Sequence, residues 1–266
     1  MPAALPWLII ALAVSMIGIA KSGFGGGLGL IVVPITALAL SSIPGYHAED
    51  ALGLLLPLLI VGDVIAVWQY RRFPNWGLIA RLAPGTIAGI ALGTGLIWLL
   101  KNQQDVAAAL INMEIGFESV LLVSLVWWRK WRGVQQKLLP EPARALATGA
   151  FAGASSTLAH AAGPIIAMYL LPLNLGRQVM VGTSATFFFF ANCAKLPTYY
   201  TAGLFDKIDP LFALRFFPLV LAGAIFGRWL VKRMSDTAFT QVVYFTVFFL
   251  GLFLFGRGLL AIIERT

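Results

Sequence analysis

The chain has 266 residues, of which 59% are hydrophobic and only 11% are charged, and its mean hydropathy is +0.87. A soluble domain is about one quarter charged. This composition therefore excludes an ordinary soluble enzyme and a disordered protein, because too few polar side chains remain to cover a water-facing surface. The net charge of +8 does not indicate nucleic acid, since the basic residues lie mainly in short loops between apolar runs.

The first predicted elements lie in residues 5–41, where Lys21-Ser-Gly-Phe-Gly-Gly-Gly separates two apolar runs. The N-terminal run has no charged leader and no clear cleavage site, so we interpret it as a membrane segment and not as a signal peptide. Each run has about 15–17 residues, which is short against the roughly 20 that a full span needs. We expect a broken helix pair or a re-entrant hairpin here.

Longer apolar segments follow along the chain. Strong spans are predicted at about 51–70, 78–100, 105–128 and 237–262. Two more are long enough but contain prolines, Asn192 and Lys195; they are predicted at about 179–203 and 210–231. Between these groups, residues 145–175 hold two short runs separated by Ser155-Ser-Thr-Leu-Ala-His-Ala-Ala-Gly-Pro164, which predicts a second broken pair.

The sequence repeats itself. The spacing of Gly53 and Asp63 returns in Gly182 and Asn192. A further series returns at one constant offset: Arg81, Pro84, Gly89 and Gly93 recur as Arg215, Pro218, Gly223 and Gly227. We therefore divide the chain into two homologous halves, 1–128 and 143–266, joined by a basic loop, 129–142. The predicted fold is an all-α polytopic membrane protein with eight to ten membrane segments.

Loop charge predicts how these halves are oriented. The loops 71–81, 129–144, 228–236 and the residues around 177 hold twelve basic residues against two acidic ones, so we place them in the cytoplasm. Loop 71–81 follows the third segment of its half, whereas 228–236 follows the fourth of its own. The halves are consequently inverted across the membrane, as in many secondary transporters. Both termini are then expected on the outer side.

Charged residues inside apolar segments are costly and point to function. Lys195 follows Asn192 by one helical turn, so both lie on one face and could supply a cation and an amide donor to an anion. The alternative is a lysine that extends to the interface beside Tyr199 and Tyr200. Lys21 directly precedes the glycine cluster and could supply a second cation to the anion. The alternative is that it is a solvated lysine in a loop.

The two broken regions supply candidate groups for binding oxyanions. Gly25, Gly26 and Gly27 leave backbone N–H groups accessible, and a half-helix that begins there adds positive charge. The second region supplies further donors: Ser155, Ser156, Thr157, His160 and Gly163. Close helix packing is the alternative role of any single glycine.

Three carboxylates are candidates for proton coupling. Asp63 occupies the position in the first half that Asn192 occupies in the second, and it could carry a proton or pair with Lys21 or Lys195. Glu114 and Glu118 are four residues apart and share a helix face, where desolvation would favour protonation. They could equally support helix contacts or face water.

Several of these residues resemble a known family. The matching segments are the glycine cluster with Pro34, Gly163-Pro164-Ile-Ile-Ala-Met-Tyr-Leu-Leu, Gly182-Thr-Ser, Asn192-Cys-Ala-Lys195 and Tyr200-Thr-Ala-Gly203. They are similar to the TauE/SafE sulfite exporters, and the likeness covers nearly the whole chain. It implies a multi-pass transporter of the bacterial inner membrane that carries sulfite, sulfonate or sulfoacetate outward, with the proton gradient as an energy source.

The resemblance also assigns residues by motif. It places the family's motif positions at Gly25 to Gly27, Pro34, Gly163, Pro164, Asn192 and Lys195. One departure bears on the substrate: the second signature reads Leu158-Ala-His-Ala-Ala where a further glycine is expected. The partners implied are a small anion and the lipid bilayer, without nucleic acid, cofactor or metal.

Other functional classes fit less well. An intramembrane enzyme would need a nucleophile with a base, an aspartate pair or a metal site. The chain has two histidines, one cysteine and no HExxH motif, so we do not expect an enzyme or catalytic residues. A channel or a non-transporting assembly factor on the same scaffold remains the alternative function.

Overall fold

A computed structural model describes residues 4–23, 32–46, 50–99 and 141–263. It also describes single positions between these ranges: 109, 113, 116, 117, 120, 121, 123, 124, 127, 128, 131 and 132. All regular elements in these described parts are helices. They form two compact units: unit 1 comprises Met1–Trp76 and Leu175–Phe239, and unit 2 comprises Gly77–Asn174 and Thr240–Thr266. Each unit draws on both predicted halves, so the units are not the repeats themselves, and the repeat boundaries stay a prediction.

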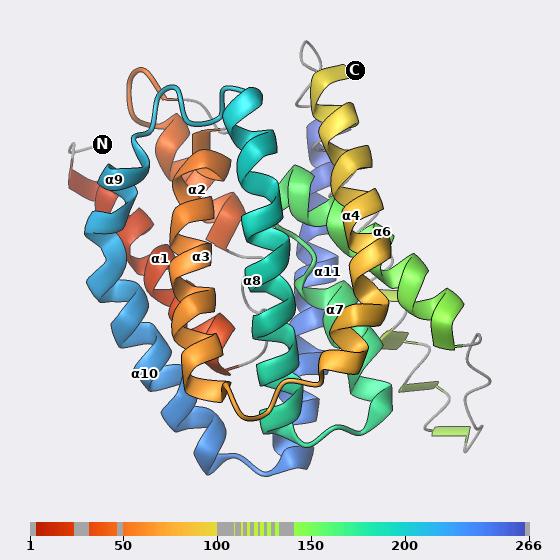
Figure 1. Cartoon of the computed structure of the whole chain (residues 1–266). Coiled ribbons are helices and arrows are strands. Elements are labelled where there is room, and N and C mark those ends of the chain that lie inside the picture. Colours follow the sequence, from red (N-terminus) through yellow and green to blue (C-terminus); the bar gives the residue numbers. More distant parts are fainter. Residues whose placement is uncertain are drawn as a thin grey trace. The chain divides into compact units, whose positions relative to one another are not determined.

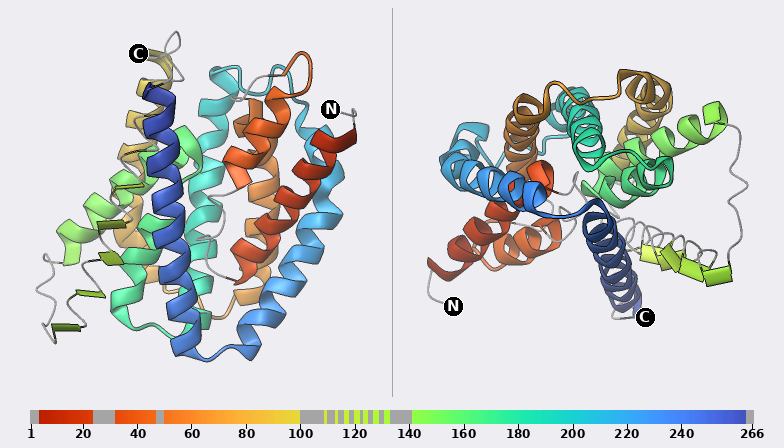
Figure 2. Two further views of the ribbon diagram at one scale, coloured as in Figure 1. Left: turned by 180° about the vertical axis from the view of Figure 1, so that it is seen from behind. Right: turned by 90° about the horizontal axis from the view of Figure 1, so that it is seen from below.

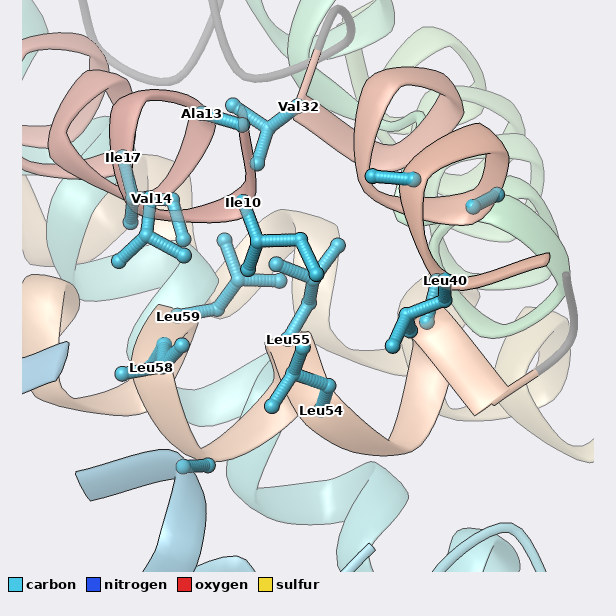
Figure 3. Packing of buried hydrophobic residues seen from close by; sticks show 14 of the residues in the cluster. Ile10, Ala13, Val14, Ile17, Val32, Leu40, Leu54, Leu55, Leu58 and Leu59 are labelled. Carbon is cyan, nitrogen blue, oxygen red and sulfur yellow. The ribbon is translucent and has the colours of Figure 1, made fainter. Parts of the chain in front are cut away.

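Unit 1 contains the long helices that carry most of the predicted charged residues. In chain order its elements are α1 (Ala4–Gly23), α2 (Val32–Ser41), α3 (Asp50–Tyr70), α8 (Arg177–Thr201), α9 (Pro210–Ala213), the 3-10 turn η3 (Leu214–Phe216) and α10 (Phe217–Arg233) (Figure 1). Its apolar core joins α1, α2 and α3 through side chains such as Ile10, Val14, Leu40, Leu54 and Leu58 (Figure 3).

Unit 2 contains the remaining elements. They are α4 (Trp76–Leu99), α6 (Glu141–Ala159), α7 (Gly163–Leu170), η2 (Leu171–Leu173) and most of α11 (Asp236–Ile263). The described positions of the predicted span 105–128 are helical, and Gly116 lies against Phe255 of α11. Pro164 occupies the first turn of α7, where its missing N–H leaves no helical hydrogen bond unmade.

Glycine allows two pairs of parallel helices to approach closely. A Cβ atom on Gly223 of α10 would lie 2.1 Å from the Ser15 carbonyl oxygen of α1. In unit 2, a Cβ on Gly89 of α4 would lie 2.0 Å from the Ala150 carbonyl oxygen of α6. Small residues at every fourth position are a common means of helix association in membranes. Figure 2 shows α1 and α10 side by side in both views.

Helices α3 and α8 run antiparallel in unit 1, and residues at corresponding repeat positions meet there. The side chains of Asp63 and Asn192 are hydrogen-bonded, and Gly182 of α8 packs on Tyr70 at the end of α3. The two parallel pairs show the same relation, since each joins the first helix of one predicted half to the fourth helix of the other. The inverted repeat itself stays a prediction.

The membrane prediction is confirmed at the level of fold class. Six helices in the described ranges are long and apolar enough to cross a membrane: Leu5–Gly23, Asp50–Tyr70, Trp76–Leu99, Arg177–Thr201, Leu211–Arg233 and Thr237–Ile263. Large apolar side chains such as Leu12, Trp68 and Phe226 are exposed on them, as suits a lipid-facing surface. We conclude that this is an all-α, multi-pass membrane protein.

The two predicted broken pairs need correction in detail. Helix α1 has 20 residues and reaches Gly23, so the first run is not short and Lys21 is not in a loop. In the second pair, α6 continues to Ala159, so Ser155, Ser156 and Thr157 are helical. The reason is that a charged or hydroxyl side chain does not end a helix when it is paired or bonded to the backbone. The second pieces, α2 with 10 residues and α7 with 8, are shorter than the expected length of about 15–17 residues.

Candidate functional site

A buried ion pair marks the centre of the candidate site in unit 1. Lys21 Nζ in the last turn of α1 lies 2.7 Å from Asp63 Oδ1 in α3, and the two side chains are 6% and 0% exposed. Gly62 packs closely on α1, because a Cβ there would lie 3.1 Å from Ile17 Cγ2 and 3.4 Å from Lys21 Cγ. Two charges at this depth are tolerated because they neutralise one another.

Helix α8 contributes the second partner of the carboxylate. Asn192 Nδ2 donates a hydrogen bond of 2.6 Å to Asp63 Oδ2, so each oxygen of Asp63 has its own donor. Phe188 lies one turn before Asn192 on the same helix face, and Lys21 Nζ lies 4.4 Å from the centre of its ring. The lysine is therefore held between a carboxylate and the face of an aromatic ring.

Lys195 is a second buried cation of the same site. It lies one turn beyond Asn192, its side chain is 0% exposed, and Nζ is 5.8 Å from the ring centre of Tyr199. Both Asp63 and Lys21 lie within electrostatic range of it. The structure thus contradicts the alternative of a lysine extended to the membrane interface, and it likewise contradicts a solvated Lys21.

The charges of the cluster do not balance. Its described residues include two lysines and one carboxylate, so the site carries one excess positive charge when both lysines are protonated. Two buried hydroxyls lie on the same helices: Ser22 follows Lys21 in α1, and Ser184 lies one turn before Phe188 in α8. Neither Ser22 Oγ nor Ser184 Oγ has a hydrogen-bond partner among the described residues. The arrangement can accept an anion and donate hydrogen bonds to its oxygens.

Sequence reasoning missed one residue of this cluster, Phe188, and did not single out the buried hydroxyls of Ser22 and Ser184. The signal for the α8 pair was available, since Ser184, Phe188 and Asn192 follow one another at intervals of four on one helix face. For Ser22, the only signal in the sequence was its position next to Lys21. The buried site combines groups of both predicted halves, with α1 and α3 from the first and α8 from the second.

The family model described as sulfite exporter TauE/SafE matches residues 10–254 of the chain. The chain belongs to this family. The family is one of exporter-type anion transporters of the membrane, which agrees with a buried cationic site on membrane-spanning helices and with our expectation that the protein is not an enzyme. Neither the curated proteins nor the solved structures contain a match.

The predicted hydroxyl donors lie in unit 2. Ser155, Ser156 and Thr157 are buried in the last two turns of α6, and Gly163 begins α7. Thr157 Oγ1 donates a hydrogen bond of 2.8 Å to the Gly153 carbonyl oxygen. That bond satisfies the hydroxyl within its own helix.

Two further observations in unit 2 bear on these donors. The Thr157 side chain also fills the space beside Gly93 of α4, since a Cβ on that glycine would lie 2.9 Å from Thr157 Cβ. His160 follows α6 with a φ of 52°, a left-handed conformation that turns the chain towards α7. Thr157 is thus a packing residue, while Ser155, Ser156 and His160 stay candidates for substrate contact.

Five predicted residues lie outside the described part of the chain. They are the glycines Gly25, Gly26 and Gly27 and the carboxylates Glu114 and Glu118. Within the described residues no group of histidine, cysteine, aspartate and glutamate is arranged to hold a metal ion. Of the predicted site, the structure therefore brings together Lys21, Asp63, Asn192 and Lys195.

Proposed function

We propose that the protein is a secondary transporter that exports a small sulfur-containing anion of the sulfite, sulfonate or sulfoacetate type. The observation that carries this proposal is the burial of two lysines, Lys21 and Lys195, with the carboxylate of Asp63 in unit 1. A desolvated cation is costly, and an incoming anion removes that cost. Family membership supports the choice of a sulfur oxyanion.

Each residue of the cluster has a separate role in this proposal. Lys195 supplies the charge that the anion neutralises, and Asn192 offers an amide donor in a fixed direction. Lys21 supports the same field from α1, where Asp63 and Phe188 hold it in place. The hydroxyls of Ser22 and Ser184 supply further donors, which suit the three oxygens of a sulfonate group.

We also propose the membrane arrangement that the sequence predicts. The halves 1–128 and 143–266 form inverted repeats, alternating access comes from movement of one repeat against the other, and loop 129–142 faces the cytoplasm. The position of Arg228 supports this orientation, because its guanidinium carbon lies 5.9 Å from the Tyr70 ring centre. The C-terminal ends of α3 and α10 therefore lie at one end of unit 1, as a shared cytoplasmic face requires. The bacterial inner membrane is the proposed location.

Anion flux in proteoliposomes tests the function. Purified protein is reconstituted and the efflux of sulfite, thiosulfate, sulfoacetate and taurine is compared for the wild type, Lys195→Ala and Lys195→Gln. Glutamine keeps most of the side-chain volume, so it separates loss of charge from loss of bulk. Lys207→Gln is the matched control, because Lys207 is a half-exposed lysine of the same unit.

We expect the wild type to move at least one sulfur anion and Lys207→Gln to match it. Both Lys195 variants should lose at least about tenfold in apparent affinity, because a unit charge several ångströms away at an effective dielectric constant of about 20 contributes a few kcal/mol. Equal anion flux in all variants would show that Lys195 does not contribute to the anion site. Electrogenic flux far above carrier rates would favour a channel, and absence of flux in a folded wild type would favour an assembly role.

A further inference from the structure

We propose that Asp63 is a resident counter-ion that occupies the place of the substrate, and that the anion binds only as Asp63 takes up a proton. This inference rests on the proposed function, because it concerns the same buried site. It assigns to the carboxylate a defined step: protonation releases Lys21 and Asn192, and the anion oxygens then take over both donors. The transported anion thereby replaces the Asp63 carboxylate as the partner of Lys21 and Asn192.

The contacts of Asp63 carry this inference. Its two oxygens engage one cationic donor and one amide donor, Lys21 Nζ at 2.7 Å and Asn192 Nδ2 at 2.6 Å. These are the kinds of donor that bind a sulfonate or sulfite oxygen. A transported oxyanion can reach them only by competing with the carboxylate. Since two anions that share one pair of donors repel each other, protonation of one favours the other.

The groups around Asp63 leave it as the natural site for the proton. Helix α1 presents Lys21 to it, and α8 presents Asn192, Lys195 and, more weakly, the thiol of Cys193. From α10, the apolar Val220 lies against Gly62, the residue before Asp63. Among the described residues, no other charged group of α2, α9, η3 or α10 acts on the carboxylate.

With both lysines protonated, the charge balance links the uptake of a proton to the binding of a dianion. With Asp63 ionised, the two lysines and the carboxylate sum to one positive charge; with Asp63 protonated they sum to two. A dianion and one proton therefore leave the site neutral, whereas a dianion alone does not. The proton and the anion are bound together and move in the same direction. A dianion with one proton still carries a net negative charge outward, so an interior-negative membrane potential favours export. An inward-directed pH gradient opposes the outward movement of the proton, so the membrane potential is the part of the proton gradient that supplies energy.

Proton uptake during anion binding tests the inference directly. Sulfoacetate is the probe, because its carboxylate and sulfonate are both ionised at neutral pH and any proton taken up belongs to the protein. Binding to the purified full chain in detergent is measured by calorimetry in buffers of different ionisation enthalpy, between about pH 6 and about pH 8. Infrared difference spectra record whether a carboxylic acid forms. Asp63→Asn is compared with Asp209→Asn, an exposed aspartate of the same unit.

We expect the wild type to take up one proton per sulfoacetate and to form a carboxylic acid. Above the pKa of Asp63 in the free protein, the affinity of the wild type for sulfoacetate should fall about tenfold per pH unit. This is the slope expected when binding is linked to the uptake of one proton. Asp63→Asn should bind without proton uptake or pH dependence, and at alkaline pH about tenfold or more tightly than the wild type. Asp209→Asn and Cys193→Ser should behave as the wild type does.

Other results would overturn the inference. Binding by the wild type without proton uptake, or a folded Asp63→Asn that no longer binds, would make Asp63 a fixed part of the site. Proton uptake or pH dependence that persists in Asp63→Asn would assign the titration to another group, such as Lys195. If the wild type binds none of the sulfur anions, the proposed function itself fails, and that result is distinct from loss of the proton link.

Discussion

Removing the carboxylate of Asp63 should destabilise the anion-free protein, and removing Lys21 as well should restore it. Asp63→Asn keeps the shape and the hydrogen bond to Asn192 but removes the carboxylate that pairs with the buried Lys21. Lys21→Met removes the paired cation and keeps an unbranched side chain beside Phe188. The double variant restores the single excess positive charge of the wild type. The four proteins therefore form a double-mutant cycle.

The distance between Lys21 and Asp63 sets the size of the expected loss of stability. Two unit charges 2.7 Å apart attract by about 6 kcal/mol at an effective dielectric constant of about 20. Desolvation offsets part of this, and loss of one partner of a buried pair typically costs about 3–5 kcal/mol. We expect Asp63→Asn to lose about 3–5 kcal/mol of unfolding free energy, and the double variant to lie within about 1 kcal/mol of the wild type.

Unfolding of the purified protein in detergent without anion measures these differences. The pair Asp50–Lys207 supplies a control cycle, since its atoms are 3.7 Å apart and the Lys207 side chain is 44% exposed. Its coupling should be below about 1 kcal/mol. If the double variant Lys21→Met/Asp63→Asn is as unstable as Asp63→Asn, or less stable, the two charges are not coupled. The charge balance on which the site is built would then be refuted.

Two further predictions concern packing. Gly89→Val should prevent folding or strongly lower the unfolding temperature in detergent, because its Cβ would lie 2.0 Å from a backbone oxygen of α6; Gly95→Val on the same helix has no described atom within 4 Å and should fold. An equal fall of the unfolding temperature in both variants would show that the close α4–α6 contact is not the reason for the loss of stability. Phe188→Leu should lower the free energy of unfolding by about 0.5–2 kcal/mol, because the ring under the Lys21 ammonium is lost. Phe190→Leu changes an exposed phenylalanine and should have little effect. A similar loss of stability in both variants would argue against the cation–π contact.

The fold class was predictable from the sequence because the bilayer imposes it. A segment of about 20 apolar residues must satisfy its backbone hydrogen bonds internally, and only a helix does so within one segment. The spans 51–70, 179–203 and 237–262 accordingly agree with α3, α8 and α11. The ends of α1 and α6 were less predictable, because Lys21 and Ser155 look like interruptions until their burial is known.

The candidate site was only partly predictable. Charged residues in apolar segments are rare and costly, so Lys21, Asp63 and Lys195 stood out by type alone. Sequence left both lysines with a solvent-exposed alternative and left Asp63 without a definite partner. Phe188 was hidden because one phenylalanine among four in succession carries no signal of its own.

The sequence by itself thus determined that the chain crosses a membrane as helices, which residues are too costly to be there without a role, and which family the chain resembles. Only the tertiary structure decided that Lys21, Asp63 and Asn192 contact one another and that Lys195 is buried beside them. The physical reason is the range of the forces. Hydrophobic transfer and backbone hydrogen bonding act segment by segment, whereas an ion pair depends on how α1, α3 and α8 pack across long separations in the chain.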